Sequence, residues 1–182
     1  MVRKTRAALA NTPISLDDHD RRLLALLQKD TAVTAEALGS KIGLSASSVQ
    51  RRIKRLRATG AITREAAVVN ADAVGKRMTF IVGVKVDIGQ KLEVAALLRR
   101  LLADYRTQQA YYVTGEVDYI LTVVVHDMQD YDEYSKTLLL SSPALSRFQS
   151  NVVIEGLKVS LEIPIEHEER AGVARGRRVA RA

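Results

Sequence analysis

The chain has 182 residues, a hydrophobic fraction of 47% and a net charge of +7, an ordinary composition for one large or two small globular domains. It contains no cysteine, which excludes disulfides, thiolate catalysis and cysteine-ligated metal sites. No apolar run approaches the length of a membrane span, and no apolar segment typical of a secretory signal follows the first basic residues. We therefore expect a cytoplasmic protein with no membrane contact.

The charge is unevenly distributed along the chain. Residues 1–64 hold 13 Lys and Arg against 5 Asp and Glu, residues 65–169 hold 10 against 16, and residues 170–182 hold five arginines and no acidic residue. A basic head, an acidic body and a basic tail indicate that only part of the molecule faces a polyanion. A chance fluctuation of composition is the alternative that charge alone leaves open.

The N-terminal third is predicted to contain a flexible arm and three short helices. The arm covers residues 1–14, and the first helix follows at Asp17–Gln28, with Ser15 as its cap and Asp18 as the reciprocal partner. Its apolar stripe is formed by Leu16, Leu23, Leu24 and Leu27.

The second and third helices are separated by a tight turn. The second helix is predicted over Thr34–Ile42, where Thr34 is the N-cap and Gly43 supplies a left-handed end. Ser45 then caps a third helix over Ala46–Thr59, which packs through Val49, Ile53 and Leu56. Two short helices, a glycine turn and a basic second helix are typical of a helix-turn-helix, here placed at residues 15–64.

The third helix carries the candidate nucleic-acid contacts on the face opposite its packing stripe. Residues 37–64 contain seven Lys and Arg and no acidic residue. A helix fits the major groove, where its first turn presents N–H groups and short polar side chains, and arginines reach guanines or phosphates. We therefore predict contacts with double-stranded DNA by Ser45, Ser47, Ser48, Gln50, Arg51, Arg52, Lys54 and Arg55. A solvated charged face on a helical hairpin is the alternative.

The kind of nucleic acid follows from a missing residue type. Residues 1–79 contain no aromatic side chain, whereas proteins that read RNA or single strands usually stack bases on aromatic rings. Duplex DNA is the better expectation.

The second domain is predicted over residues 78–165, after a linker with a short strand over residues 65–77. Its elements follow the order strand, helix, strand, strand, helix, strand, and they are predicted at Met78–Val86, Lys91–Leu102, Thr107–Val113, Tyr119–Val125, a helix capped by Asp127 with Asp130, and Ser150–Ile163 bent at Gly156.

This order predicts an α+β fold of the ferredoxin-like βαββαβ type, with an antiparallel sheet and both helices on one face. The other face is expected to carry Ile81, Val113, Val153 and Leu161. Burial of this apolar face against a second copy predicts a homodimer, which would also address two DNA half-sites. Residues 166–182 are predicted to be a basic flexible tail.

The chain resembles the Lrp/AsnC family, the leucine-responsive and asparagine-responsive regulators, over about Leu16–Ile165. In the first domain the resemblance rests on Leu16-Asp17-x-x-Asp20, Ile42-Gly43-Leu44-Ser45, Val49-x-x-Arg52-Ile53-x-x-Leu56 and Gly60-x-Ile62. In the second domain it rests on Val113-Thr114-Gly115-x-x-Asp118-Tyr119 and the strand that follows.

The resemblance implies a sequence-specific DNA-binding transcriptional regulator with a winged-type helix-turn-helix and a RAM-type second domain. It further implies dimers that assemble into octamers or other rings, and an amino acid or related small metabolite as effector. The implied effector site comprises Gly115, Glu116, Val117, Asp118 and Tyr119, with Gln149, Ser150 and Val152 nearby.

The implied effector loop has a plausible chemistry. The N–H groups of Glu116 and Val117 could hold a carboxylate, and Asp118 could take an ammonium group. A simple hairpin turn made by Gly115 is the alternative. Val117 departs from the family, in which an aromatic residue is frequent at this place. The arginine-rich stretch Arg170–Arg181 extends beyond the family core, as a phosphate-binding arm or a solubilising tail.

Other classes of function find less support. His19, His126 and His167 lack catalytic or ligand spacing, and the chain contains neither a phosphate-binding glycine loop nor a G-x-S-x-G motif. The acidic residues Asp127, Asp130, Asp132 and Glu133 fit the start of a helix better than a metal site. We expect no enzyme, metal or cofactor. An RNA-recognition domain would need aromatics on its central strands, and a stand-alone metabolite module would not need the basic helices.

Overall fold

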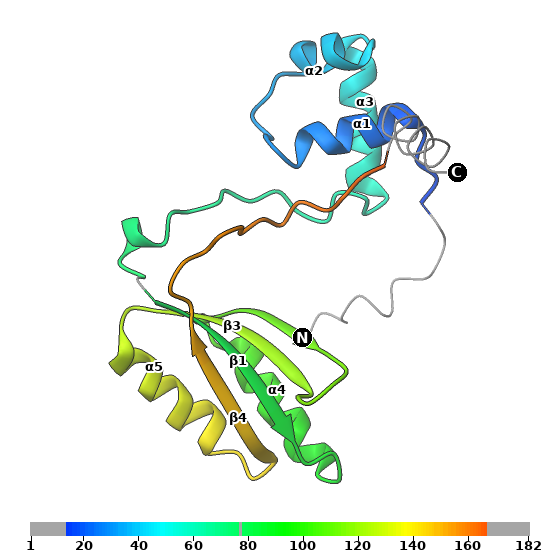
Figure 1. Cartoon of the computed structure of the whole chain (residues 1–182). Helices are drawn as coiled ribbons and strands as arrows, with labels where there is room; N and C mark the ends of the chain where they lie inside the picture. The colour runs from blue at the N-terminus through cyan, green and yellow to red at the C-terminus, as the bar shows by residue number, and fades with distance from the viewer. Residues whose placement is uncertain (1–13, 77, 167–182) are drawn as a thin grey trace, which may run out of the picture. The chain divides into compact units, whose positions relative to one another are not determined.

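The computed structural model describes residues 14–76 and 78–166 (Figure 1). They form two compact units: residues 14–67 together with 160–166, and residues 68–159. Most of the predicted N-terminal arm and of the basic tail lies outside the described residues. Within these ranges, no helix is long and apolar enough to cross a membrane.

The first unit contains the three predicted helices, α1 (Asp18–Leu27), α2 (Ala35–Ile42) and α3 (Ala46–Ala58). The predicted caps of the last two are confirmed: Thr34 accepts a hydrogen bond from the N–H of Ala37, and Ser45 accepts one from that of Ser48. The buried core of the unit is formed by Leu23, Leu27, Leu38, Ile42, Val49 and Leu56.

The turn between α2 and α3 brings two backbone segments very close together. Gly43 ends α2 with φ of 73°, as predicted for a left-handed terminus. A Cβ atom placed on Gly39 would lie 2.3 Å from the carbonyl oxygen of Leu44, so no side chain fits at this position. This close approach fixes where α3 begins relative to α2.

The predicted cap of α1 is wrong. The N-cap is Asp17, not Ser15: the carboxylate of Asp17 accepts from the N–H of Asp20 at 2.8 Å, and that of Asp20 accepts from the N–H of Asp17 at 3.1 Å. The predicted pair, Ser15 and Asp18, and the observed pair, Asp17 and Asp20, have the same spacing in the sequence. Asp17 is favoured because a carboxylate interacts well with the positive end of a helix, and because Arg52 of α3 contacts it.

The stretch after α3 also differs from the prediction. Among the described residues 59–76 there is no strand, so the short strand predicted within residues 65–77 is wrong and no β-wing follows α3. This stretch contains instead the 3₁₀ helix η2 (Asp72–Val74), which ends at Gly75 with φ of 73°. A lone extended segment gains strand hydrogen bonds only from a neighbouring strand, and the described part of the chain offers none here.

The second unit has the predicted order of strands and helices. Its elements are β1 (Met78–Val86), α4 (Lys91–Ala103), β2 (Thr107–Tyr112), β3 (Tyr119–Val125), α5 (Met128–Tyr134), which continues as the π-helix η3 (Ser135–Leu140), and β4 (Leu145–Val152). The sheet order is β2-β3-β1-β4, and every pairing is antiparallel. The α+β fold is thereby confirmed.

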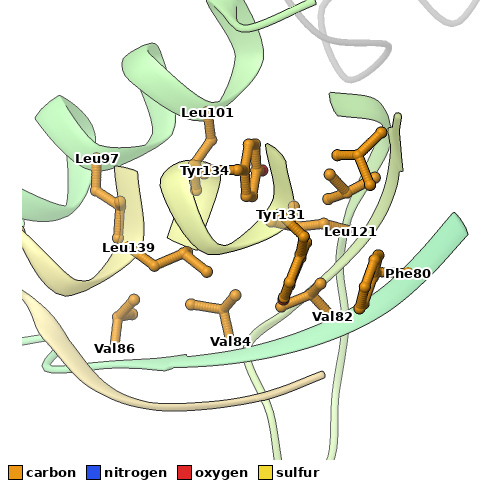
Figure 2. Close-up of a cluster of buried hydrophobic side chains, with 12 residues drawn as sticks. Phe80, Val82, Val84, Val86, Leu97, Leu101, Leu121, Tyr131, Tyr134 and Leu139 are labelled. Atoms are coloured by element: carbon orange, nitrogen blue, oxygen red, sulfur yellow. The ribbon is translucent and has the colours of Figure 1, made fainter. Parts of the chain in front are cut away.

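The core of the second unit lies between the sheet and its two helices (Figure 2). Alternate residues of β1 point into it, and the ring of Phe80 stacks on Tyr131 of α5 at a centroid distance of 3.6 Å. The remaining buried members come from β3, α4, α5 and η3: Leu121, Val123, Val125, Leu97, Leu101, Tyr134 and Leu139. Because both helices contribute to one core, they cover the same face of the sheet, as predicted.

An ion-pair cluster closes the corner between α4 and β2. Arg106, whose side chain is 8% exposed, donates to both carboxylate oxygens of Asp104 at 2.9 Å and to Asp130 at 2.9 Å. The hydrogen bond from Arg106 lowers the pKa of Asp104, and these carboxylates raise the pKa of Arg106. The cluster ties α5 to the end of α4.

The last strand is shorter than predicted and begins earlier, at Leu145 and not at Ser150. It ends at Val152, and residues 153–166 form no strand, although Val153 still donates a hydrogen bond to Thr79 at 2.8 Å. The period-two pattern continues through Leu157, Val159 and Leu161, but this segment pairs with no strand among the residues that the structure describes. Leu161 is therefore not on the sheet.

The final described residues return to the first unit. The side-chain amide of Gln28, at the end of α1, donates to the carbonyl oxygen of Ile163 at 2.9 Å and accepts from its N–H at 3.1 Å. The helix-turn-helix unit is therefore built from two separate stretches of sequence.

Candidate nucleic-acid interface and effector loop

The start of α3 presents a cluster of hydroxyl groups. The Oγ atom of Ser45 lies 3.0 Å from Oγ of Ser48 and 3.2 Å from Oγ of Ser47. The first turn of α3 contains no acidic residue. The positive helix end is thus not neutralised locally, and together with the hydroxyl groups it suits a phosphate or other anionic oxygen.

Arg51 lies one turn further along this surface. It lines one shallow hollow with Ser47 and Ser48, and another with Arg52 and Arg55. Its side chain is exposed and makes no hydrogen bond or ion pair with any described residue, and the same holds for Gln50 and Lys54. These three side chains are free to contact an external partner.

Arg52 and Arg55 are engaged differently. Arg52 donates to Asp17 at 2.6 Å and to Asp20 at 2.8 Å, while Arg55 donates to the other oxygen of Asp20. Asp20 has no exposed surface. Desolvation by burial acts to raise the pKa of Asp17, but the hydrogen bond from Arg52 outweighs it, so the pKa of Asp17 is lowered. Both carboxylates raise the pKa of Arg52. The structure thus divides the predicted basic residues of α3 into exposed side chains and side chains bound to α1.

The loop between β2 and β3 contains the predicted effector residues. Gly115 adopts φ of 122°, which favours glycine. The carboxylate of Asp118 accepts from the N–H of Val86 at 2.9 Å and from Lys85 at 3.3 Å, and its pKa is lowered chiefly by the Val86 N–H. Sequence reasoning missed these two partners because they lie 32 and 33 residues away on β1.

Part of the predicted effector set converges on Gly83 of β1. A Cβ atom on Gly83 would lie 3.1 Å from a methyl group of Val117, so the loop folds closely over the strand. Gly83 also pairs with Gln149 of β4 in the sheet register. Val117 and Gln149 therefore lie on either side of Gly83 on the sheet face opposite the helices. In the sequence, a glycine within the alternating pattern of β1 could have indicated that another segment approaches the strand closely at this point.

Three other predicted effector residues, Tyr119, Ser150 and Val152, lie on the side of the sheet that faces the helices. The hydroxyl of Ser150 hydrogen bonds to the hydroxyl of Tyr131 on α5, and Val152 pairs with the core residue Phe80. Tyr119 packs against the core and lies 5.2 Å from the ring of Tyr112. The structure thus separates Ser150 and Val152 from Gln149.

Comparison with known proteins identifies both units. Residues 16–57 match the AsnC-type helix-turn-helix domain, and residues 79–163 match the Lrp/AsnC ligand binding domain. The chain belongs to the Lrp/AsnC family. It is 34% identical over 169 residues to the HTH-type transcriptional regulator y4tD of Sinorhizobium fredii, across 91% of this chain and 98% of the relative.

Solved structures of Lrp/AsnC-family proteins share the fold of this regulator. An AsnC family transcriptional regulator from Agrobacterium tumefaciens has a TM-score of 0.76 at 27% identity, covering 82% of this chain and 97% of the other. A transcriptional regulator from Neisseria meningitidis, solved as a complex with L-methionine, has a TM-score of 0.75 at 25% identity, with the same coverage. This Lrp/AsnC-family chain is a DNA-binding transcriptional regulator and not an enzyme.

Proposed function

We propose that this regulator reads specific duplex DNA through the exposed face of α3, and that an amino acid or related small metabolite modulates its assembly or DNA affinity. The observation that carries the proposal is one surface on which Ser47, Ser48 and Arg51, which has no partner among the described residues, meet at a helix N-terminus without acidic residues in its first turn. Such a surface offers hydrogen-bond donors to base edges and to phosphates.

The outward sheet face supports a homodimer as the DNA-binding species. Ile81 is exposed on this face, and the register places Thr122 opposite it and Ile120 opposite Gly83. Burial of Ile81 and Ile120 against a second copy would favour a dimer, and two copies of α3 can address two half-sites. Further assembly of dimers into an octamer or a larger ring is part of the proposal.

The effector part of the proposal rests on the loop over Gly83. The N–H groups of Glu116 and Val117 make no hydrogen bond with any described residue, so they can hold a carboxylate. Asp118 would bind an ammonium group in place of Lys85, which now contacts it. The Neisseria meningitidis regulator in complex with L-methionine supports an amino acid as the kind of effector.

DNA reading is tested by footprinting on the DNA upstream of the regulator's own gene, followed by affinity measurements on the protected operator. Arg51→Ala and Ser47→Ala are each expected to weaken operator binding by about 1–3 kcal/mol, roughly 5- to 150-fold, with an unchanged oligomeric state. Lys91→Ala removes an exposed positive charge from the sheet unit and is the matched control. If both α3 variants bind the operator like the parent, the proposed surface is wrong.

Effector binding is tested separately by calorimetry with the common amino acids. We expect heat with at least one of them, and we expect Gln149→Ala to weaken that interaction while leaving operator binding by the ligand-free protein unchanged. The absence of heat with every amino acid, together with normal DNA binding, would contradict amino-acid sensing and leave DNA reading intact.

A further inference from the structure

We propose that Asp20 is a positioning residue that withholds Arg52 and Arg55 from DNA, so that α3 contacts DNA with only part of its basic residues. The inference rests on the proposed DNA contact by α3 and deepens it. It divides the basic side chains of α3 into those that contact DNA and those that bind carboxylates of the protein itself.

The geometry around Asp20 is that of a closed ionic link between two helices. One carboxylate oxygen accepts from Arg52 at 2.8 Å, and the other accepts from Arg55 and from the N–H of Asp17 at 3.1 Å. The carboxylate of Asp17 adds a second contact to Arg52 at 2.6 Å. Two carboxylates at the start of α1 thus hold two guanidinium groups that stand nearly one turn apart on α3.

Burial makes this link difficult to exchange for a phosphate. Asp20 has no exposed surface, and the side chain of Arg52 is only 20% exposed. If the arginines left, the buried carboxylate would keep only the N–H of Asp17 and no counter-charge, which is strongly unfavourable. A DNA phosphate approaches from water, where its attraction is screened by salt. The arginines therefore stay with Asp20 when DNA binds.

Arg51 provides the internal contrast. It neighbours Arg52 in the sequence, yet its side chain is exposed and has no partner among the described residues. Arg55 is the stricter test of the inference. Its side chain is 49% exposed, so by residue type and exposure alone it would be expected to contact DNA as Arg51 does.

The inference has a signature in the salt dependence of DNA binding. Each phosphate neutralised by a basic side chain adds about 0.9 to the slope of log affinity against log salt concentration. Between 50 and 200 mM salt, one such contact changes the relative affinity about 3.5-fold. Arg51→Gln should lower the slope by about one contact, whereas Arg55→Gln should leave it unchanged.

Asp20→Asn should act in the opposite direction. The neutral amide holds guanidinium groups weakly, so up to two arginines become available to phosphates and the slope steepens by about 0.9 for each. Because phosphate contacts carry no sequence information, affinity for random duplex DNA should rise and the ratio of operator to random affinity should fall.

The experiment measures the anisotropy of labelled operator and random duplexes, from 50 to 200 mM salt, for the full-length parent and the three variants. A purely structural role for Asp20 would lower affinity for both duplexes without steepening the slope, and that result overturns the inference. An Arg55→Gln slope as shallow as that of Arg51→Gln also overturns it. If Asp20→Asn does not fold by circular dichroism, the comparison of Arg51 with Arg55 decides. A parent that binds no duplex DNA overturns both this inference and the proposed function.

Discussion

The helix-turn-helix unit and the sheet unit are stabilised in different ways. Among the described residues, the core cluster of the first contains six buried apolar side chains, all aliphatic, whereas that of the second contains twelve, among them the aromatic residues Phe80, Tyr131 and Tyr134. Buried apolar area is the main favourable term in folding, so the sheet unit has the larger reserve. Each unit also contains an ion-pair cluster: Asp20 binds arginines of the basic helix α3 in the first unit, and Arg106 binds Asp104 and Asp130 in the second. In the first unit, α3 therefore contributes both to the stability of the fold and to the proposed DNA-binding surface.

The largest expected effect comes from Leu38→Ala in the smaller core. Leu38 is one of the six buried residues of this core, and its truncation should lower the free energy of unfolding by about 3–4 kcal/mol. Operator binding should be lost while the sheet unit stays folded. Because residues 1–79 contain no aromatic side chain, near-UV circular dichroism reports only the sheet unit. The signal should be retained in Leu38→Ala and reduced in Leu121→Ala. Its loss in both would contradict independent units.

A smaller effect is expected from Asp104→Asn in the sheet unit. The largely buried Arg106 then loses its bidentate partner, which should cost about 2 kcal/mol at pH 7. The hydrogen bond from Arg106 holds the pKa of Asp104 below its ordinary value of 3.8. The pair therefore contributes fully above that value and loses its contribution as the pH falls through the lower, folded-state pKa. Urea unfolding at pH 7 and below pH 4 should show the two proteins converging in acid.

Tyr134→Phe should have a weaker effect of about 1 kcal/mol, because it removes the hydrogen bond between the Tyr134 hydroxyl and Thr107 at 2.8 Å. Burial raises the pKa of Tyr134 to about 12. A raised pKa means that the neutral phenol stabilises the folded state below the ordinary value near 10, and that this contribution is lost as the pH rises toward 12. Thermal unfolding should show the parent losing its advantage over the variant in that window. A constant difference would contradict it.

The smallest expected effect belongs to Gln28→Ala. It removes two exposed hydrogen bonds to Ile163, and it should lower the free energy of unfolding of the first unit by about 0.5–1 kcal/mol. Hydrogen exchange at the Ile163 amide should become faster. The matched control is Lys29→Ala, which changes an exposed neighbour whose side chain makes no bond with a described residue. Equal exchange rates in both variants would show that the hydrogen bonds between Gln28 and Ile163 do not stabilise the segment around Ile163.

Local signals allowed most of the fold to be predicted from the sequence. Thr34, Gly43 and Ser45 act on backbone groups within a few residues, so spacing alone located the ends of α2 and the start of α3. The alternation of Met78–Val86 and its partner β3 predicted the sheet for the same reason. The two overlapping cap patterns of α1 could not be separated locally, because Arg52 contacts Asp17 from 35 residues away.

The features that could not be predicted depend on contacts between segments that are far apart in the sequence. The alternation through Leu157 and Val159 is typical of a strand, but a strand also needs a neighbouring strand to pair with. The alternating pattern does not predict whether such a neighbour exists. The candidate site shows the same limit. Arg51 and Arg55 are the same residue type on the same basic helix, and only the buried Asp20 distinguishes them. The outward position of Val117 likewise depends on Gly83, which lies on another strand.

The contact between Gln28 and Ile163 joins positions 135 residues apart. Since a ribosome releases the chain from its N-terminus, α1, α2 and α3 emerge first but cannot form this contact until the stretch around Ile163 has followed. The sheet, whose last strand ends at Val152, has all of its segments earlier. The regulator thus completes its DNA-binding unit only after every strand and helix of the sheet unit has been synthesised.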